Sequence, residues 1–233
     1  MAFLKRDPIE GRQPKIRLLF DLIELNQEET LLIKKILRTT LILFAASGLF
    51  AAAASAGVPT EQLRGTVDRV LAILQDSSLK PQAKQNERRE QLRQVIFARF
   101  DFPEMARRSL GAEWRRRSLA EQQEFTRLFT DLLRDNYVST IESYNGEKVG
   151  YNRETQEQNT AEVQTVLTAS NSTNYSLNYR LHLVGKDWKV YDVVIEGISL
   201  VNNYRSQFNR FLAKSSYEDL VRTLKEKTLD GKK

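Results

Sequence analysis

The sequence contains no cysteine and a single histidine, His182. The absence of cysteine excludes disulfides, thiolate metal sites, cysteine nucleophiles and lipid-modified cysteines. A single histidine excludes a metal site built from several histidines. The chain also has no internal repeat and no low-complexity linker, which favours one compact domain.

The composition is that of an ordinary globular protein. Of the 233 residues, 41% are hydrophobic and 28% are charged, which is too apolar for a disordered chain. Lys and Arg number 36 against 30 Asp and Glu, a formal net charge of +6. This mild excess indicates at most one basic face, because net charge bears on partners and not on fold.

One uncharged run, residues 39–56, follows the basic stretch 34–38 and ends in an A-x-A sequence at 54–56. This order predicts a signal peptide at 34–56, cleaved after about Ala56. The alternative is a transmembrane anchor, because about 18 apolar residues is the lower limit of a span. No later stretch is long and apolar enough to cross a bilayer, so the remainder, 57–233, is expected to be one soluble domain outside the cytoplasm.

Residues 1–33 carry mixed charges ahead of that basic stretch, which is unusual for a signal peptide. One interpretation is that the start is assigned too early and that translation begins near residues 31–33. The other is a cytosolic tail that precedes an uncleaved anchor.

Helical periodicity marks the first half of the domain. Leu63, Val67 and Leu74 belong to one apolar stripe. Ser118 and Glu121 form a capping box, which predicts the start of the strongest helix. Two further helices are expected near the C-terminus, the second after the S-x-x-E sequence at 215–218. The apolar face of the strongest helix contains Phe125, Leu128, Phe129, Leu132, Leu133, Tyr137, Ile141 and Tyr144.

From residue 148 the apolar period changes to two, which predicts four short antiparallel strands. On the last strand, strict alternation places Tyr191, Val193 and Ile195 on one face, with Asp192 and Glu196 on the other. The expected fold is α+β, with amphipathic helices packed on one face of a curved four-stranded antiparallel sheet. The pattern leaves open whether that face borders a solid core or an apolar pocket.

Catalytic signatures are scarce. The sequence lacks nucleotide-binding glycine motifs, G-x-S-x-G and H-E-x-x-H, and Ser77-x-x-Lys80 lacks the companion motifs of the enzymes that share it. His182 falls on the polar side of its strand. Asp192 is a candidate general base, with a structural hydrogen bond as the alternative.

Basic residues cluster around Gly111: they are Arg107, Arg108, Arg115, Arg116 and Arg117. Nucleic-acid binding asks for exposed aromatics interleaved with such charges in a protein that meets nucleic acid, and an exported protein seldom does. Docking on anionic lipid headgroups or on an acidic partner is one interpretation, and a solvated face is the other.

The segment WKVYDVVIEGISLVNNYRSQF (188–208) resembles the signature of the MlaC, or toluene-tolerance, family of periplasmic phospholipid-binding proteins. The stretches 100–114 and 118–129 resemble the helical half of the same family. The likeness covers roughly residues 60–228.

This resemblance implies a soluble periplasmic phospholipid carrier over residues 57–233, with an NTF2-like fold, an extra helical part and one apolar pocket. Such a carrier shuttles lipid between outer and inner membranes as the substrate-binding component of an ABC-transporter pathway for outer-membrane lipid asymmetry. The implied partners are an inner-membrane ABC transporter complex and an outer-membrane lipoprotein–porin complex. No enzyme activity, cofactor, metal or nucleic acid is implied, and we expect a monomer.

The candidate pocket combines residues from two sources. The resemblance contributes Tyr191, Val193, Ile195, Gly197, Ile198, Leu200, Val201, Tyr204 and Phe208. The apolar pattern contributes Val149, Tyr151, Val163, Leu177, Tyr179, Leu181, Phe125, Phe129 and Leu132. The alternative function is a small NTF2-like isomerase or hydratase, in which Asp192 or a buried tyrosine moves a proton on a hydrophobic substrate. Headgroup preference, the number of acyl chains and the direction of transport stay open.

Overall fold

A computed structural model describes residues 57–230. The predicted signal peptide and the preceding extension lie outside the described residues. Between residues 57 and 230, no helix combines the length and the apolar character needed to cross a membrane.

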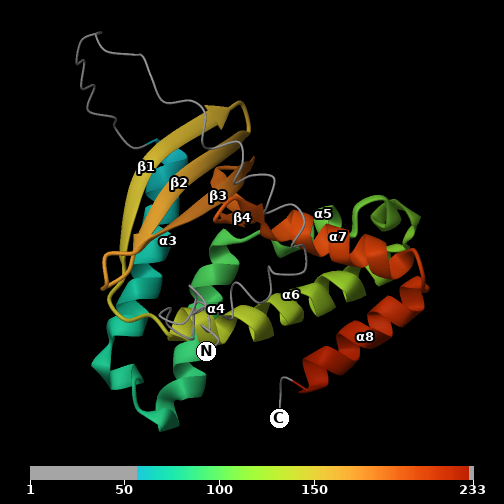
Figure 1. Cartoon of the computed structure of the whole chain (residues 1–233), viewed down its shortest axis with the longest axis horizontal. Helices are drawn as coiled ribbons and strands as arrows, with labels where there is room; N and C mark the ends of the chain where they lie inside the picture. Colours follow the sequence, from blue (N-terminus) through green and yellow to red (C-terminus); the bar gives the residue numbers. More distant parts are fainter. Residues whose placement is uncertain (1–56, 231–233) are drawn as a thin grey trace, which may run out of the picture. The chain divides into compact units, whose positions relative to one another are not determined.

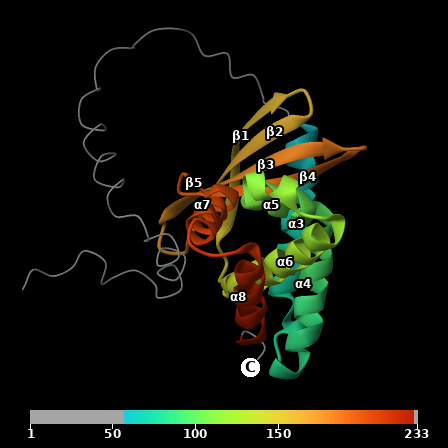
Figure 2. The same ribbon diagram turned by 90° about the vertical axis from the view of Figure 1, so that its right-hand side faces the viewer.

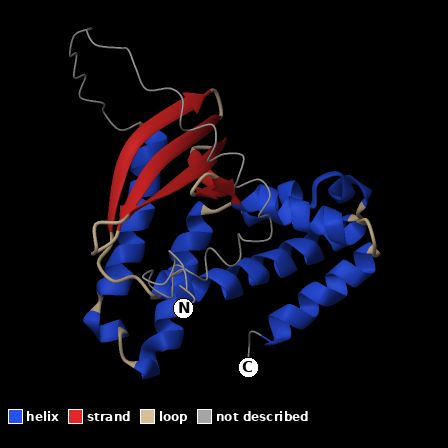
Figure 3. Cartoon of the chain, in the orientation of Figure 1, coloured by secondary structure: helices blue, strands red, loops and turns tan. Residues whose placement is uncertain are grey.

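Helices form both ends of the described chain, and the sheet is inserted between them (Figure 3). Three short 3-10 turns, at 77–79, 82–84 and 111–116, join the early helices. The α-helices are α3 (Val58–Gln75), α4 (Gln85–Arg99), α5 (Phe102–Leu110), α6 (Leu119–Glu142), α7 (Leu200–Leu212) and α8 (Tyr217–Asp230).

The sheet is an antiparallel meander in the order β1-β2-β3-β4-β5. The predicted α+β class is confirmed, but the sheet has five strands and not four, because a two-residue strand follows β4. Positive φ angles at Glu196 and Gly197 make the tight hairpin turn that brings this strand back. The strands are β1 (Lys148–Glu157), β2 (Thr160–Thr168), β3 (Asn174–Val184), β4 (Asp187–Ile195) and β5 (Ile198–Ser199).

Side-chain caps lie at both helix starts for which the sequence contains a capping motif. The capping box at the start of α6 is confirmed: Glu121 Oε2 accepts from the Ser118 amide at 2.6 Å, and Ser118 Oγ accepts from the Glu121 amide at 3.3 Å. At α8 the pair lies one residue later than the S-x-x-E sequence indicated. Ser216 Oγ accepts from the Asp219 amide at 3.1 Å, so Ser216 is the capping residue.

Two bulges interrupt the regular alternation of the sheet. Asn152 is the surplus residue of β1, because Tyr151 pairs with Thr165 and Arg153 already pairs with Gln164. Tyr191 is the surplus residue of β4, since Asp192 is opposite Arg180 and Val190 is opposite Leu181. Each bulge changes which side chains beyond it reach a given face.

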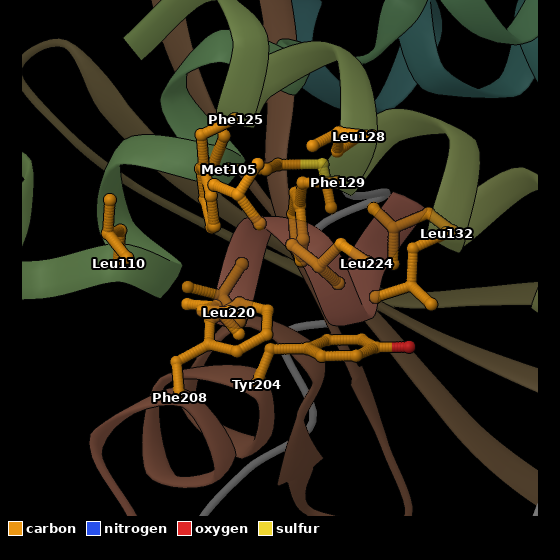
Figure 4. Close-up of a cluster of buried hydrophobic side chains, with 14 of the residues drawn as sticks. Met105, Leu110, Phe125, Leu128, Phe129, Leu132, Tyr204, Phe208, Leu220 and Leu224 are labelled. Atoms are coloured by element: carbon orange, nitrogen blue, oxygen red, sulfur yellow. The ribbon is translucent and has the colours of Figure 1, made fainter. Parts of the chain in front are cut away.

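Buried side chains form two clusters. The sheet cluster joins the inner face of the sheet to α3: it contains Leu63, Ala161, Val163, Leu181, Trp188, Val190 and Val193. The helical cluster lies between α5, α6, α7 and α8 (Figure 4), and its centre is Phe125, Phe129, Tyr204 and Phe208. Half-buried Phe100, at the α4–α5 junction, packs against both clusters.

Helix α3 lies along the sheet in two perpendicular views (Figures 1 and 2), and its Leu63 and Val67 pack on the inner face. Strand-facing residues of α6 were expected to cover that face as well. Instead, Phe125, Phe129 and Leu132 of α6 belong to the helical cluster. Helix α6 packs with α5, α7 and α8 in this cluster, while α3 packs on the inner face of the sheet.

The opposite face of β4 meets α5 and α7 through polar and aromatic contacts. Asp101, which caps α5 by accepting from the Glu104 amide at 3.0 Å, also lies 3.0 Å from His182 Nε2. The Arg108 guanidinium stacks 4.0 Å from the centre of the Tyr191 ring. These contacts join the helical part to the sheet.

Candidate functional site

The inner face of the sheet is built from rows of side chains that the strand register sets side by side. Tyr151, Thr165, Leu177 and Ile195 form one row across four strands. The next row toward the other end contains Val163, Tyr179 and Val193, and the row after that contains Ala161, Leu181 and Val190. Alternation along each strand points all these side chains to the face that α3 covers.

Burial changes along these rows. We call Ala161, Val163, Leu181, Trp188, Val190 and Val193 the closed end, because all six are buried. We call Val149, Tyr151, Leu167, Tyr175, Leu177 and Ile195 the open end, because all six are only half-buried. Between the two ends lie buried Thr165 and half-buried Tyr179. The inner face therefore offers a continuous apolar surface that is sealed at one end and accessible at the other.

Polar contacts hold α3 at the closed end. Glu154 of β1 accepts a hydrogen bond from the Thr60 amide at 2.8 Å and so caps the first turn of α3. Gln62 Oε1 accepts from the Trp188 amide at 2.8 Å and from Arg99 at 2.7 Å. This end of α3 is therefore fixed to β1 and β4.

Chain connectivity places the helix ends around the open end. The segment after α6 leads into β1 just before Val149, and β4 is followed after Ile195 by β5 and then α7. At the far end of α3, Gln75 Nε2 donates to the Tyr144 hydroxyl at 3.1 Å, which ties α3 to the segment after α6. The last turn of α3 and the segment after α6 therefore lie beside the open end.

Two tyrosines give this apolar surface a polar component. The Tyr151 hydroxyl is buried and has no hydrogen-bond partner within residues 57–230. Burial raises its pKa to about 12, and the charge of Asp68 acts in the same direction. Burial also raises the pKa of Tyr179, with a further contribution from Tyr151. Both phenols are therefore protonated at neutral pH, and Tyr151 has an unused O–H donor.

The bulge in β4 corrects the predicted position of Tyr191. Arg180 and His182 share one face of β3, opposite to Tyr179 and Leu181. Tyr191 contacts His182, with ring centres 5.6 Å apart, and Asp192 pairs with Arg180 at 3.2 Å. Tyr191 and Asp192 therefore both lie on the outer face, while Val193 and Ile195 lie on the inner face. Strict alternation was wrong here because it cannot register a surplus residue.

Asp192 has structural partners for both of its carboxylate oxygens. Oδ1 accepts from the Val201 amide at 3.0 Å, and Oδ2 accepts from Ser199 Oγ at 2.6 Å as well as from Arg180. The carboxylate is buried at the start of α7, where it accepts from a first-turn amide that has no partner within the helix. These contacts agree with the second interpretation of Asp192, in which it makes structural hydrogen bonds. They also direct its carboxylate away from the inner face.

The other predicted pocket residues fall into separate environments. Leu200 is half-buried against the helical cluster, whereas Gly197 and Ile198 are exposed at the β4–β5 turn. Val163, Leu181 and Val193 belong to the sheet cluster; Tyr151, Leu177, Tyr179 and Ile195 pack against it; and Val149 is half-buried at the open end. Phe125, Phe129, Leu132, Val201, Tyr204 and Phe208 belong to the helical cluster.

Sequence reasoning left several inner-face residues out of the candidate site. Trp188 and Val190 lie before the bulge, so they share a face with Val193 despite the odd spacing. Leu167 and Tyr175 were assigned to strands but not to the pocket. Their register opposite Val149 and each other is the signal that places them at the open end.

The structure also divides the five clustered arginines. Arg108 stacks on Tyr191, and Arg117 stacks 4.5 Å from the Tyr217 ring centre while it pairs with Glu113 and Glu121. These two are half-buried and hold helices together. Arg107, Arg115 and Arg116 are exposed.

Two surface grooves of the described part lie away from the inner face. One of about 380 Å³ lies between α6 and α8 and is lined by Tyr217, Val221 and several charged side chains. Another of about 350 Å³ lies between α5, the 3-10 turn at 111–116 and the start of α6. Residues 57–230 contain no group of three or more acidic or histidine side chains placed to hold a metal ion.

Comparisons with known proteins agree on one family. The family model described as MlaC protein matches residues 64–226. The toluene tolerance protein ttg2D of Pseudomonas putida is 25% identical over 196 residues, which cover 83% of this chain and 87% of that protein. The solved structure of a phospholipid-binding protein from Ralstonia solanacearum, in complex with a phospholipid, is similar with a TM-score of 0.67 and 26% identity. That match covers 74% of this chain and 98% of the other.

Proposed function

The chain belongs to the MlaC family, and from that premise we propose that it is a phospholipid carrier whose acyl chains lie against the open end of the inner face. The observation that carries this proposal is the half-buried apolar surface of Val149, Leu167, Leu177 and Ile195, continuous with the sealed sheet cluster. The phospholipid bound by the similar Ralstonia protein supports the ligand class.

The energetic requirement of such a carrier is large. Removing a long acyl chain from a bilayer into water costs about 0.8 kcal/mol per methylene, or on the order of 10 kcal/mol per chain. The protein must replace this environment with apolar surface of comparable area. The open end supplies side chains of that kind, and α3 and α6 frame it in a position to enclose hydrocarbon.

The Tyr151 phenol suits the polar part of such a ligand. Its hydroxyl is buried without a partner within residues 57–230, and a buried donor left unsatisfied is costly. An ester carbonyl or phosphate oxygen of a phospholipid would accept that hydrogen bond. The proposed orientation therefore places the acyl chains along the rows and the glycerol region near Tyr151.

The proposed place of action is the periplasm, after removal of the segment 34–56. There the protein would carry phospholipid between the outer and inner membranes, as the substrate-binding component of an ABC transporter pathway. Its proposed partners are that inner-membrane transporter and an outer-membrane lipoprotein–porin complex. Carriage of this kind needs no bond-making chemistry, in accord with the structural role of Asp192.

Native mass spectrometry of the protein purified from cells tests the proposal. We expect a co-purifying mass that fragments as phospholipid, and we expect Leu177→Asp to remove it by placing a charge among the acyl chains. Asn178→Asp is the matched control, because Asn178 is the next residue of β3, is also half-buried and points to the other face. Absence of lipid from the wild-type protein, or equal loss in both variants, would contradict the proposal.

A further inference from the structure

The groove between α5, the 3-10 turn at 111–116 and the start of α6 combines exposed apolar groups with arginine. Its walls include Pro103, Trp114, Leu119, Gln123 and Arg127. Leu119 is the most exposed large hydrophobic side chain of the described residues, at 77%. It stands at the first position of α6, where nothing in the helical cluster requires an apolar residue.

Arginines surround this groove in excess over carboxylates. Glu104 is shared by Arg107 and Arg108, and Glu113 is shared by Arg116 and Arg117. Arg117 also pairs with Glu121, so these four arginines face three carboxylates. Arg115 is exposed and has no ion pair within residues 57–230, which adds a further positive charge.

The backbone that carries these side chains is well fixed. Gln122 Nε2 donates to the carbonyl oxygens of Trp114, at 2.9 Å, and Arg117, at 3.2 Å. The capping box at Ser118 then holds the first turn of α6. Leu119 and the exposed arginines are thus presented together on a preformed corner, and binding would cost little ordering entropy.

We infer that this corner docks on an anionic phospholipid surface. A leucine that protrudes from a rim of arginines matches the headgroup region, where apolar side chains enter the acyl boundary and arginines pair with phosphate. The charge excess selects anionic over neutral lipid. This surface is separate from the open end of the sheet, so the inference does not rest on the proposed lipid-carrying function.

The absence of cysteine allows a site-specific test in the full chain. Leu119→Cys carries the environment-sensitive dye NBD, and vesicles contain either equal parts of phosphatidylglycerol and phosphatidylcholine or phosphatidylcholine alone. We expect a blue-shifted, brighter emission with the anionic vesicles only. The same dye at Thr155→Cys, an exposed position of β1, should not respond. The uncharged run 39–56 would bind both vesicle types, so the difference between them is the readout.

Charge reversal provides the second arm. Arg115→Glu with Arg116→Glu should weaken the binding of the labelled protein to anionic vesicles by at least about 30-fold, because two attractive charges are lost and two repulsive ones are added. Arg153→Glu with Arg210→Glu changes the net charge equally at exposed positions elsewhere and should have a much smaller effect. An unchanged emission at position 119, an equal response at position 155, or equal effects of the two charge reversals would overturn the inference. If the groove binds an acidic protein instead, the emission at position 119 would be unchanged by vesicles.

Discussion

The helical cluster and the open end of the sheet are both apolar, but they differ in how completely their side chains are packed. In the helical cluster, aromatic rings contact one another directly: Phe129 meets Tyr204 edge-on at 5.3 Å, and Phe125 meets Phe208 at 5.5 Å. At the open end, the side chains of Leu177 and Ile195 are half-buried, and the Tyr151 hydroxyl lacks a partner within residues 57–230. Side chains that pack fully against one another stabilise the fold. Apolar surface that stays half-buried is available to a ligand.

The largest expected effect comes from breaking the satisfied cluster. Phe129→Ala removes a fully buried ring and should lower the free energy of unfolding by about 3–5 kcal/mol. Leu177→Ala at the open end should cost only about 1 kcal/mol, because the side chain is half-buried, yet it should reduce lipid retention. Urea unfolding monitored by circular dichroism, together with lipid mass spectrometry, measures both. Equal destabilisation by the two substitutions would remove the proposed distinction between the regions.

A smaller effect is expected at the ion pairs that join α4 to α6. Glu142, whose side chain is 9% exposed, accepts from Arg88 at 3.1 Å and from Arg89 at 2.9 Å. Burial alone would raise the pKa of Glu142, but hydrogen bonds from Arg89 and Arg88 outweigh burial and lower it. Glu142→Gln should therefore cost about 2 kcal/mol at pH 7.

The lowered pKa also gives this contribution a pH dependence. Stability from Glu142 is fully present above the unfolded-state pKa, near 4.5, and is lost as the pH falls through the lower folded-state value. The difference between wild type and Glu142→Gln should thus shrink during acidification below about pH 5. Glu90→Gln, which breaks an exposed pair with Arg93, is the control and should change stability little at any pH. A pH-independent difference for Glu142 would contradict this assignment.

The smallest effects compare two tyrosine hydroxyls. Tyr204 in the helical cluster accepts from Asn136 Nδ2 at 3.0 Å, so Tyr204→Phe should cost about 1 kcal/mol. Tyr151→Phe removes a hydroxyl without a partner in the described part of the chain and should leave stability unchanged or slightly higher. If Tyr151 donates to a bound phospholipid, Tyr151→Phe should instead weaken lipid retention in a competition assay with labelled lipid. A large loss of stability in Tyr151→Phe would show that its hydroxyl has a structural role.

Local signals predicted the elements well. The capping box at Ser118 and the apolar stripe after it predicted α6, and period-two alternation predicted four main strands. The resemblance of the segment 188–208 predicted the family that the match over residues 64–226 establishes. These signals can be recognised in the sequence because each depends on residues within one short segment.

Long-range features could not be obtained in the same way. Nothing in the pattern of α6 distinguishes a helix that covers a sheet from one that packs on three other helices, because both need the same apolar stripe. The bulge at Tyr191 was also invisible, since it depends on the register with β3. For these reasons the residues predicted for one pocket are distributed over two clusters, and Tyr191 lies on the outer face.

That bulge has a consequence for how β4 tolerates changes in length. Without Tyr191 the strand would still alternate, with Trp188, Val190, Val193 and Ile195 on the inner face. The extra residue is therefore unnecessary for the apolar face of the sheet. What the extra residue adds is a second consecutive outward side chain. Arg108 of α5 stacks on Tyr191, while Asp192 accepts a hydrogen bond from the first turn of α7. A chain shortened by one residue here would keep its sheet, but a single outward side chain would have to contact both α5 and α7.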